Sequence, residues 1–125
     1  MNKVRNYLFL LIFSSLFGQN VDMYLALLEK GNIKDVKETL PELISKFPNN
    51  AGVLYLKALL TVEGASSIKQ YKNIIENYSE SKYAANSAMK LGEYFYAKGL
   101  YTQSANLLKN IPHKYPRFQD MQRLT

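Results

Sequence analysis

The sequence predicts an all-α protein made of helical hairpins, and three observations lead to this prediction. Apolar residues recur at steps of three and four along most of the chain, which places them on one stripe of a helix. Glycines interrupt this pattern where one helix would end and the next begin. The pattern occurs three times, at offsets of 31 and 37 residues. No segment shows the alternation of a β-strand with comparable strength.

The first segment differs from the rest and has the order of a secretory signal peptide. Lys3 and Arg5 precede an apolar run from Tyr7 to Phe17, and Gly18 follows as a small residue. At about 1.5 Å per residue, this run covers only half of a hydrocarbon core of ~30 Å, so no stable membrane span is expected. We therefore expect residues 1–18 to be a signal peptide cleaved near Gly18. The alternative is a buried first helix, which the lack of a polar face disfavours.

The repeated pattern marks the second helix of each hairpin. Its members are separated by steps of 4, 3, 4 and 1, and the three copies are Val36, Leu40, Leu43, Phe47 and Pro48; Ser67, Tyr71, Ile74, Tyr78 and Ser79; and Ser104, Leu108, Ile111, Tyr115 and Pro116. The closing prolines should end the first and third of these helices. Two further prolines fall inside them. Pro41 is expected to kink its helix, whereas Pro112 either kinks its helix or ends it early.

Another helix precedes each of these. Residues 51–62 and 84–98 have the length and periodicity of helices, and residues 21–30 match more weakly. Turns at Gly31, at Gly64–Ser66 and at Gly99 separate the two members of each pair, and glycine suits a left-handed cap there. The sequence therefore predicts six helices in three antiparallel hairpins.

The third hairpin resembles a tetratricopeptide repeat (TPR), which is 34 residues long. Between Ala85 and Phe118, the family's L-G, aromatic, G-x-Y and terminal proline are matched by Leu91-Gly92, Phe95, Gly99-Leu100-Tyr101 and Tyr115-Pro116. Ser104 stands where the family has a small residue in its second helix, usually alanine. The first repeat matches at Gly31 and at Phe47-Pro48-Asn49-Asn50. The second is shorter in its turn and has Lys57-Ala58 in place of Leu-Gly and Ser79 in place of the proline.

This resemblance implies a short right-handed α-solenoid of three TPR-like hairpins over residues 19–118, followed by residues 119–125 as the start of a further helix or a truncated cap. In such proteins the first helices line a concave face that holds extended peptides or partner helices. In this register the peptide-binding face would be lined by Tyr55, Leu59, Val62, Asn86, Met89, Glu93 and Tyr96.

Residues 71–85 (YKNIIENYSESKYAA) resemble more narrowly the degenerate repeats of bacterial envelope proteins. These include the coordinator of the Tol-Pal system, modules that precede peptidoglycan-binding SPOR domains, and the repeat lipoprotein of the outer-membrane assembly machinery. The chain has no cysteine for a lipid anchor and so departs from the lipoprotein. The resemblance implies a non-enzymatic scaffold or adaptor, periplasmic or secreted, linked to Tol-Pal, peptidoglycan or cell division. The alternative is a module that assists outer-membrane protein assembly.

Composition and charge argue against other classes of function. Hydrophobic residues make up 47% of the chain and charged residues 21%, as in ordinary globular proteins. The net charge of +6 comes from dispersed lysines without the basic cluster expected of a nucleic-acid binder. It therefore indicates a solvated surface, with weak attraction to anionic lipid or polymer as the alternative. The single histidine, His113, has no second histidine or cysteine to complete a metal or catalytic site. We expect protein or peptide partners and no enzyme activity, cofactor, metal or nucleic acid.

The end of the chain suggests an incomplete cap. Phe118, Met121 and Leu124 are spaced by three, as in the first turns of another helix, but this segment is too short to be stable alone. It would leave the outer apolar side chains of the third hairpin poorly covered, with Leu107, Leu108 and Ile111 as the candidates. We expect self-association through this end, or a further segment that covers it.

Overall fold

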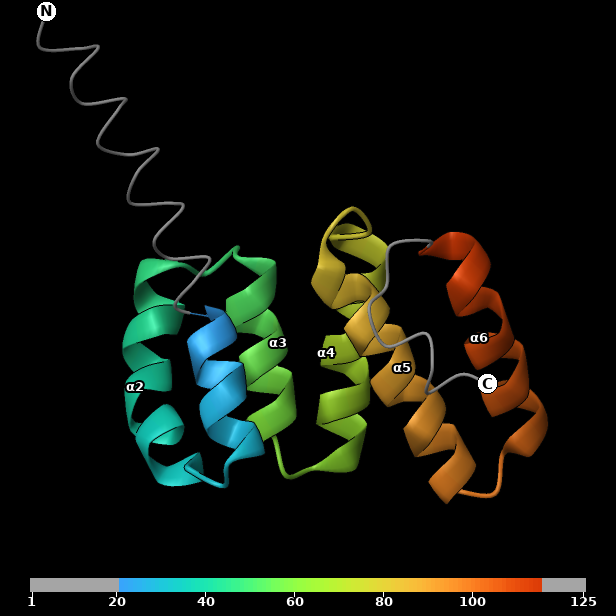
Figure 1. Cartoon of the computed structure of the whole chain (residues 1–125), viewed down its shortest axis with the longest axis horizontal. Coiled ribbons are helices and arrows are strands. Elements are labelled where there is room, and N and C mark those ends of the chain that lie inside the picture. Colours follow the sequence, from blue (N-terminus) through green and yellow to red (C-terminus); the bar gives the residue numbers. More distant parts are fainter. Residues whose placement is uncertain (1–20, 116–125) are drawn as a thin grey trace, which may run out of the picture. The chain divides into compact units, whose positions relative to one another are not determined.

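The computed structural model describes residues 21–115 of the chain. The predicted signal peptide at residues 1–18 and the predicted further helix at residues 119–125 lie outside them. Within the described residues every regular element is an α-helix (Figure 1). A helix over residues 21–29 precedes α2 (Ile33–Lys46), α3 (Ala51–Leu60), α4 (Gly64–Asn77), α5 (Lys82–Ala97) and α6 (Tyr101–Lys114). The predicted all-α class is confirmed.

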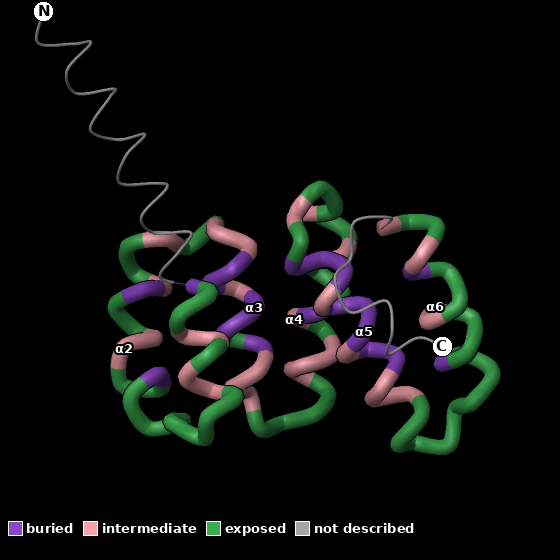
Figure 2. Tube along the Cα trace, viewed as in Figure 1, coloured by how far each residue is buried: buried purple, intermediate pink, exposed green. Residues whose placement is uncertain are grey.

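The chain divides into two compact units, Met1–Leu56 and Lys57–Thr125, with the boundary inside α3. Each unit buries the apolar stripes of its own helices, coloured purple in Figure 2. The core of the first unit includes Val21, Val36, Leu43, Val53, Tyr55 and Leu56, and that of the second includes Tyr71, Ile74, Ala84, Ala88, Leu91 and Ile111. The repeated pattern therefore marks a buried side of α2, α4 and α6.

Two glycines end helices in the left-handed conformation, as their positions in the sequence predict. Gly31 has φ +88° and Gly99 has φ +77°. At the end of α5, the Leu100 N–H donates to the Phe95 carbonyl at 2.9 Å, and the Gly99 N–H donates to the Tyr96 carbonyl at 3.0 Å. This pair of bonds is a Schellman motif, which satisfies the last carbonyls of α5 and reverses the chain into α6.

The turn expected at Gly64–Ser66 lies earlier in the chain than predicted, because α4 already begins at Gly64. Three residues, 61–63, connect α3 to α4, and Glu63 in an extended conformation completes the reversal. No left-handed glycine is needed in so short a connection.

The internal prolines do not interrupt their helices. Helix α2 continues through Pro41, and α6 continues through Pro112 to Lys114, so the early end considered for Pro112 is wrong. Pro48 follows the end of α2 directly after Phe47, as predicted. Pro116 lies outside the described residues.

In the second unit, α5 packs against α4 on one side and α6 on the other. Helices α5 and α6 approach closely at Gly92, where an added β-carbon would lie 2.5 Å from Leu108 Cδ2. The Ser104 hydroxyl donates to the Gly92 carbonyl at 2.8 Å and links the two helices at the same level. Ile111 is buried against Ala88 and Met89, with Leu107 and Leu108 half-buried beside them. The expectation that Ile111 is poorly covered is therefore wrong.

Candidate functional site

The seven residues predicted to line a peptide-binding face differ widely in exposure. Val62 is 92% exposed and Tyr96 is 65% exposed, so both are open to a partner. Leu59, Asn86 and Glu93 are half-buried. Tyr55 and Met89 belong to the cores of their units, at 5% and 6% exposure. The predicted face therefore consists of two open residues and three partly open ones, and a partner would reach the other two only after rearrangement.

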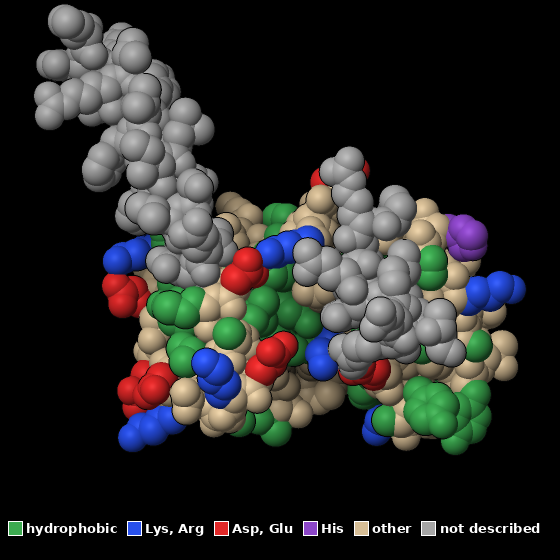
Figure 3. Space-filling view, viewed as in Figure 1, with side chains coloured by type: hydrophobic (Ala, Val, Ile, Leu, Met, Phe, Trp, Pro, Cys, Tyr) green, Lys and Arg blue, Asp and Glu red, His purple; other side chains and the backbone are tan. Residues whose placement is uncertain are grey.

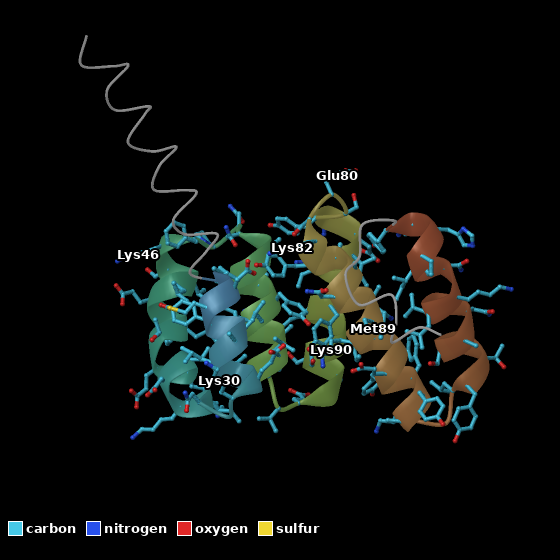
Figure 4. The ribbon with its side chains drawn as sticks, in the orientation of Figure 1. Lys30, Lys46, Glu80, Lys82, Met89 and Lys90 are labelled. Atoms are coloured by element: carbon cyan, nitrogen blue, oxygen red, sulfur yellow. The ribbon has the colours of Figure 1, made fainter. Side chains whose placement is uncertain are left out.

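Two of these residues are held by neighbours inside the second unit. Met89, labelled on α5 in Figure 4, packs with Ile111 of α6. Glu93 lies one turn further along α5, and its Oε2 is 3.4 Å from Lys90 Nζ. Both of these charged side chains are partly exposed, which makes the pair a weak contributor to stability.

Glu93 also influences a buried phenol on α4. Burial raises the pKa of Tyr71 above its ordinary value of 10.0, and the negative charge of Glu93 raises this pKa further. A hydrogen bond with Ser67 acts in the opposite direction. The charge of Glu93 on α5 therefore acts on a buried group of α4 as well as on solvent.

Three exposed apolar side chains gather around the turn between α5 and α6. Tyr96, Leu100 and Tyr101 are 65%, 42% and 61% exposed, and the rings of Tyr96 and Tyr101 meet edge to face with centroids 5.1 Å apart. Lys98 lies between them in sequence, with its Nζ 5.7 Å from the centre of the Tyr94 ring. We call Tyr96, Lys98, Leu100 and Tyr101 the aromatic tip. Figure 3 shows a cluster of hydrophobic side chains, in green, at the lower right, where the turn between α5 and α6 lies.

Sequence reasoning included Tyr96 but missed the other members of the aromatic tip. Leu100 and Tyr101 match the G-x-Y positions of the repeat, and this match predicts a part in the repeat motif rather than in binding. Their position beside a glycine turn was readable from the sequence, but their exposure was not. Val62 occupies a comparable place in the turn between α3 and α4.

Across residues 21–115, histidine, aspartate and glutamate nowhere gather in a group of three that could hold a metal ion. None of the helices within that range combines the length and apolar character needed to cross a membrane.

Comparisons with known proteins identify no relative from which a function could be transferred. No protein-family model matches the chain, and neither the curated proteins nor the solved structures yield a significant match.

Proposed function

We propose that this chain is a TPR-like helical-repeat scaffold or adaptor that binds other proteins in the bacterial cell envelope, in a role linked to Tol-Pal, peptidoglycan or cell division. The observation that carries this proposal is the contact between α5 and α6. Gly92 and Ser104 occupy the small-residue positions of the repeat motif, and they allow close approach and a hydrogen bond between these helices. A helix pair joined in this way is the unit from which such repeats are stacked.

The exposed residues support a binding role for this scaffold. Val62 and Tyr96 are large apolar side chains open to solvent, and both belong to the predicted peptide-binding face. Aromatic side chains are frequent anchors of protein interfaces because they bury a large area at a small entropic cost. The charged start, apolar run and Gly18 of the N-terminal segment support export to the periplasm.

A photo-crosslinking amino acid placed at position 96 in living cells tests the binding role. We expect a discrete crosslinked product of higher mass from an envelope fraction, and none from the same amino acid at Lys72, an exposed position of α4. N-terminal sequencing of the crosslinked product should show that this protein, as distinct from its partner, begins near Gln19.

A second set of variants tests whether the predicted face is the surface involved. Tyr96→Ala combined with Leu59→Ala should abolish partner capture while helical circular dichroism is retained. If the folded double variant still captured its partner, the binding surface would lie elsewhere. Export is a separate question, and recovery of the protein with Met1 intact from a cytosolic fraction would contradict it. The identity of the captured protein separates the Tol-Pal or division role from outer-membrane protein assembly.

A further inference from the structure

The turn between α5 and α6 combines exposed apolar side chains with an absence of negative charge. Residues 96–103 are all exposed, and three of them are large apolar residues. After Glu93 the next acidic residue of the sequence is Asp120. The basic residues between these two are Lys98, Lys109, Lys114 and Arg117. Because Glu93 lies beside Lys90, its charge is already partly compensated.

A second exposed apolar residue lies at the same end of this unit. A β-carbon at Gly64, the first residue of α4, would lie 3.4 Å from Tyr94 Cε2 near the end of α5. The turn before α4 and the aromatic tip therefore occur at one end of the unit, as Figure 1 also shows. Val62 in that turn is 92% exposed, and Glu63 beside it is the acidic residue nearest to it in sequence.

We propose that the aromatic tip docks on an anionic lipid surface. In this arrangement Leu100 and the ring of Tyr101 enter the boundary between headgroups and acyl chains, and the Lys98 ammonium contacts lipid phosphate. Tyr96, whose ring packs against that of Tyr101, remains at the edge of the contact and open to a protein partner. Tyrosine suits this boundary because its ring is apolar and its hydroxyl remains hydrated, and lysine extends its charge to the headgroups in the same way. The inference goes beyond the scaffold function and does not depend on which protein that scaffold binds.

The exposure and charge of the aromatic tip favour lipid over an acidic protein partner. Tyr96 lies in the last turn of α5, Leu100 in the connection and Tyr101 at the start of α6, so the three side chains are open to solvent at one end of the helix pair. An exposed apolar group enters a lipid boundary without a preformed cavity, whereas a protein partner would need a pocket of matching shape. The positive charge of Lys98, in a stretch with no acidic residue from 94 to 115, adds attraction to an anionic bilayer.

Tryptophan fluorescence provides a test at a single site, because the chain contains no tryptophan. The full chain carrying Tyr101→Trp is mixed with vesicles of phosphatidylglycerol and phosphatidylcholine, with bromine atoms on the acyl chains as quenchers. The control is Ser79→Trp, an exposed position next to Glu80 in the turn between α4 and α5, at the opposite end of the unit (Figure 4). Since binding through the N-terminal apolar segment alone would not insert position 101 selectively, the comparison isolates the aromatic tip.

We expect a blue shift and quenching at position 101 with anionic vesicles, and little change at position 79. In the Tyr101→Trp background, Lys98→Glu should weaken this partition about five-fold or more, since each lysine near an anionic surface contributes roughly that factor. Lys72→Glu makes the same charge change on α4 and should have a much smaller effect. Added salt should reduce the signal, as expected for exposed charges.

Three results would overturn the proposal. The first is no quenching at position 101 with anionic vesicles in a variant that retains its helical circular dichroism, which would favour an acidic protein as the partner of the aromatic tip. The second is equal quenching at positions 79 and 101, which would mean non-specific adsorption. The third is a blue shift and quenching at position 101 that are as large with pure phosphatidylcholine vesicles as with anionic ones, which would show that the contact between Lys98 and anionic lipid contributes nothing.

Discussion

Two buried serines of the second unit have opposite hydrogen-bonding states. Ser104 is 2% exposed and donates from its hydroxyl to the Gly92 carbonyl at 2.8 Å. Ser87 is fully buried, and its hydroxyl has no hydrogen-bond partner within the described part of the chain. A satisfied buried hydroxyl stabilises a fold modestly, whereas an unsatisfied one costs about 1–3 kcal/mol.

Replacing each serine by alanine tests this difference. Both variants gain the same helix propensity from alanine, so that contribution cancels between them. We expect Ser87→Ala to be more stable than Ser104→Ala by about 1–3 kcal/mol, because the first removes an unpaired group and the second removes a hydrogen bond. Urea denaturation followed by circular dichroism measures the difference. Equal midpoints would show that the two hydroxyls have equivalent surroundings.

Tyr71 makes stability depend on pH in the alkaline range. Burial holds its pKa above the ordinary value of 10.0, so the folded state retains the phenol proton longer than the unfolded state does. Its contribution to stability is fully present below pH 10. As pH rises from there through the folded pKa, the unfolded state ionises first and the free energy of unfolding falls.

We therefore expect Tyr71→Phe to lose part of the alkaline destabilisation seen in the parent chain. Tyr101→Phe removes an exposed phenol instead and is the matched control. Urea midpoints measured at several values between pH 8 and pH 11.5 compare the three proteins. Parallel curves for the parent and Tyr71→Phe would contradict the assignment.

The sequence predicts some single-residue features well and others poorly. Gly31 and Gly99 were predictable because a left-handed cap favours glycine whatever the tertiary contacts are. The burial of Tyr55 and Met89 was not predictable in this way, since the register of the repeat places both on the predicted peptide-binding face. A helical stripe identifies which side chains share a side, but it does not say which side a neighbouring helix will cover.

At the scale of helices, the predicted elements exist and their ends differ slightly. The helix predicted over residues 84–98 spans Lys82–Ala97, because the Ser81 hydroxyl caps it by accepting from the Tyr83 N–H at 3.2 Å. The helix predicted over residues 51–62 ends at Leu60, where the Thr61 N–H donates to the Ala58 carbonyl and tightens the last turn. Such ends depend on individual hydrogen bonds, which periodicity does not reveal.

The approach of α5 and α6 at Gly92 leads to a prediction for this helix pair. A β-carbon at Gly92 would lie 2.5 Å from Leu108 Cδ2 and 2.8 Å from Leu108 Cγ, so alanine requires Leu108 or the helix to move. We expect Gly92→Ala to destabilise by about 1–3 kcal/mol, the usual cost of overpacking. Thermal unfolding followed by circular dichroism gives the value.

A double substitution separates this steric effect from a general effect of alanine. Leu108→Ala removes the atoms that an added β-carbon would meet, so Gly92→Ala should cost much less in that background than in the parent chain. The same cost in both backgrounds would exclude Leu108 as the cause. The sequence suggested Gly92 through its resemblance to a repeat motif, but the contact with Leu108 is visible only in three dimensions.

At the scale of the whole molecule, charge is divided unevenly between the two units. Between residues 21 and 56 four lysines are opposed by five acidic residues, whereas between residues 57 and 115 eight lysines are opposed by four. The excess positive charge of the described residues therefore belongs to the unit that carries the aromatic tip. This division could be read from the sequence once the unit boundary was known, but composition alone averages it over the chain.

The two units share α3, since their boundary falls between Leu56 and Lys57 inside this ten-residue helix. In the first part of α3, Val53 and Leu56 are buried, and in the second part Ala58 is buried and its carbonyl accepts from the Ser67 hydroxyl at 3.3 Å. A helix nucleates at a high cost, so either half of α3 would be unstable without the other. Stability should therefore be transmitted between the units through the continuity of this helix.

Lys57→Gly tests this transmission without removing a buried side chain, because Lys57 is exposed. Glycine weakens a helix by about 1 kcal/mol, and at this position the loss applies to the helix that both units share. We expect amide hydrogen exchange to accelerate in α2 of the first unit as well as in α4 of the second. Lys72→Gly makes the same change inside α4 and should accelerate exchange mainly in the second unit. If Lys57→Gly left exchange in α2 unchanged, the units would be energetically independent, and α3 would serve only as their covalent connection.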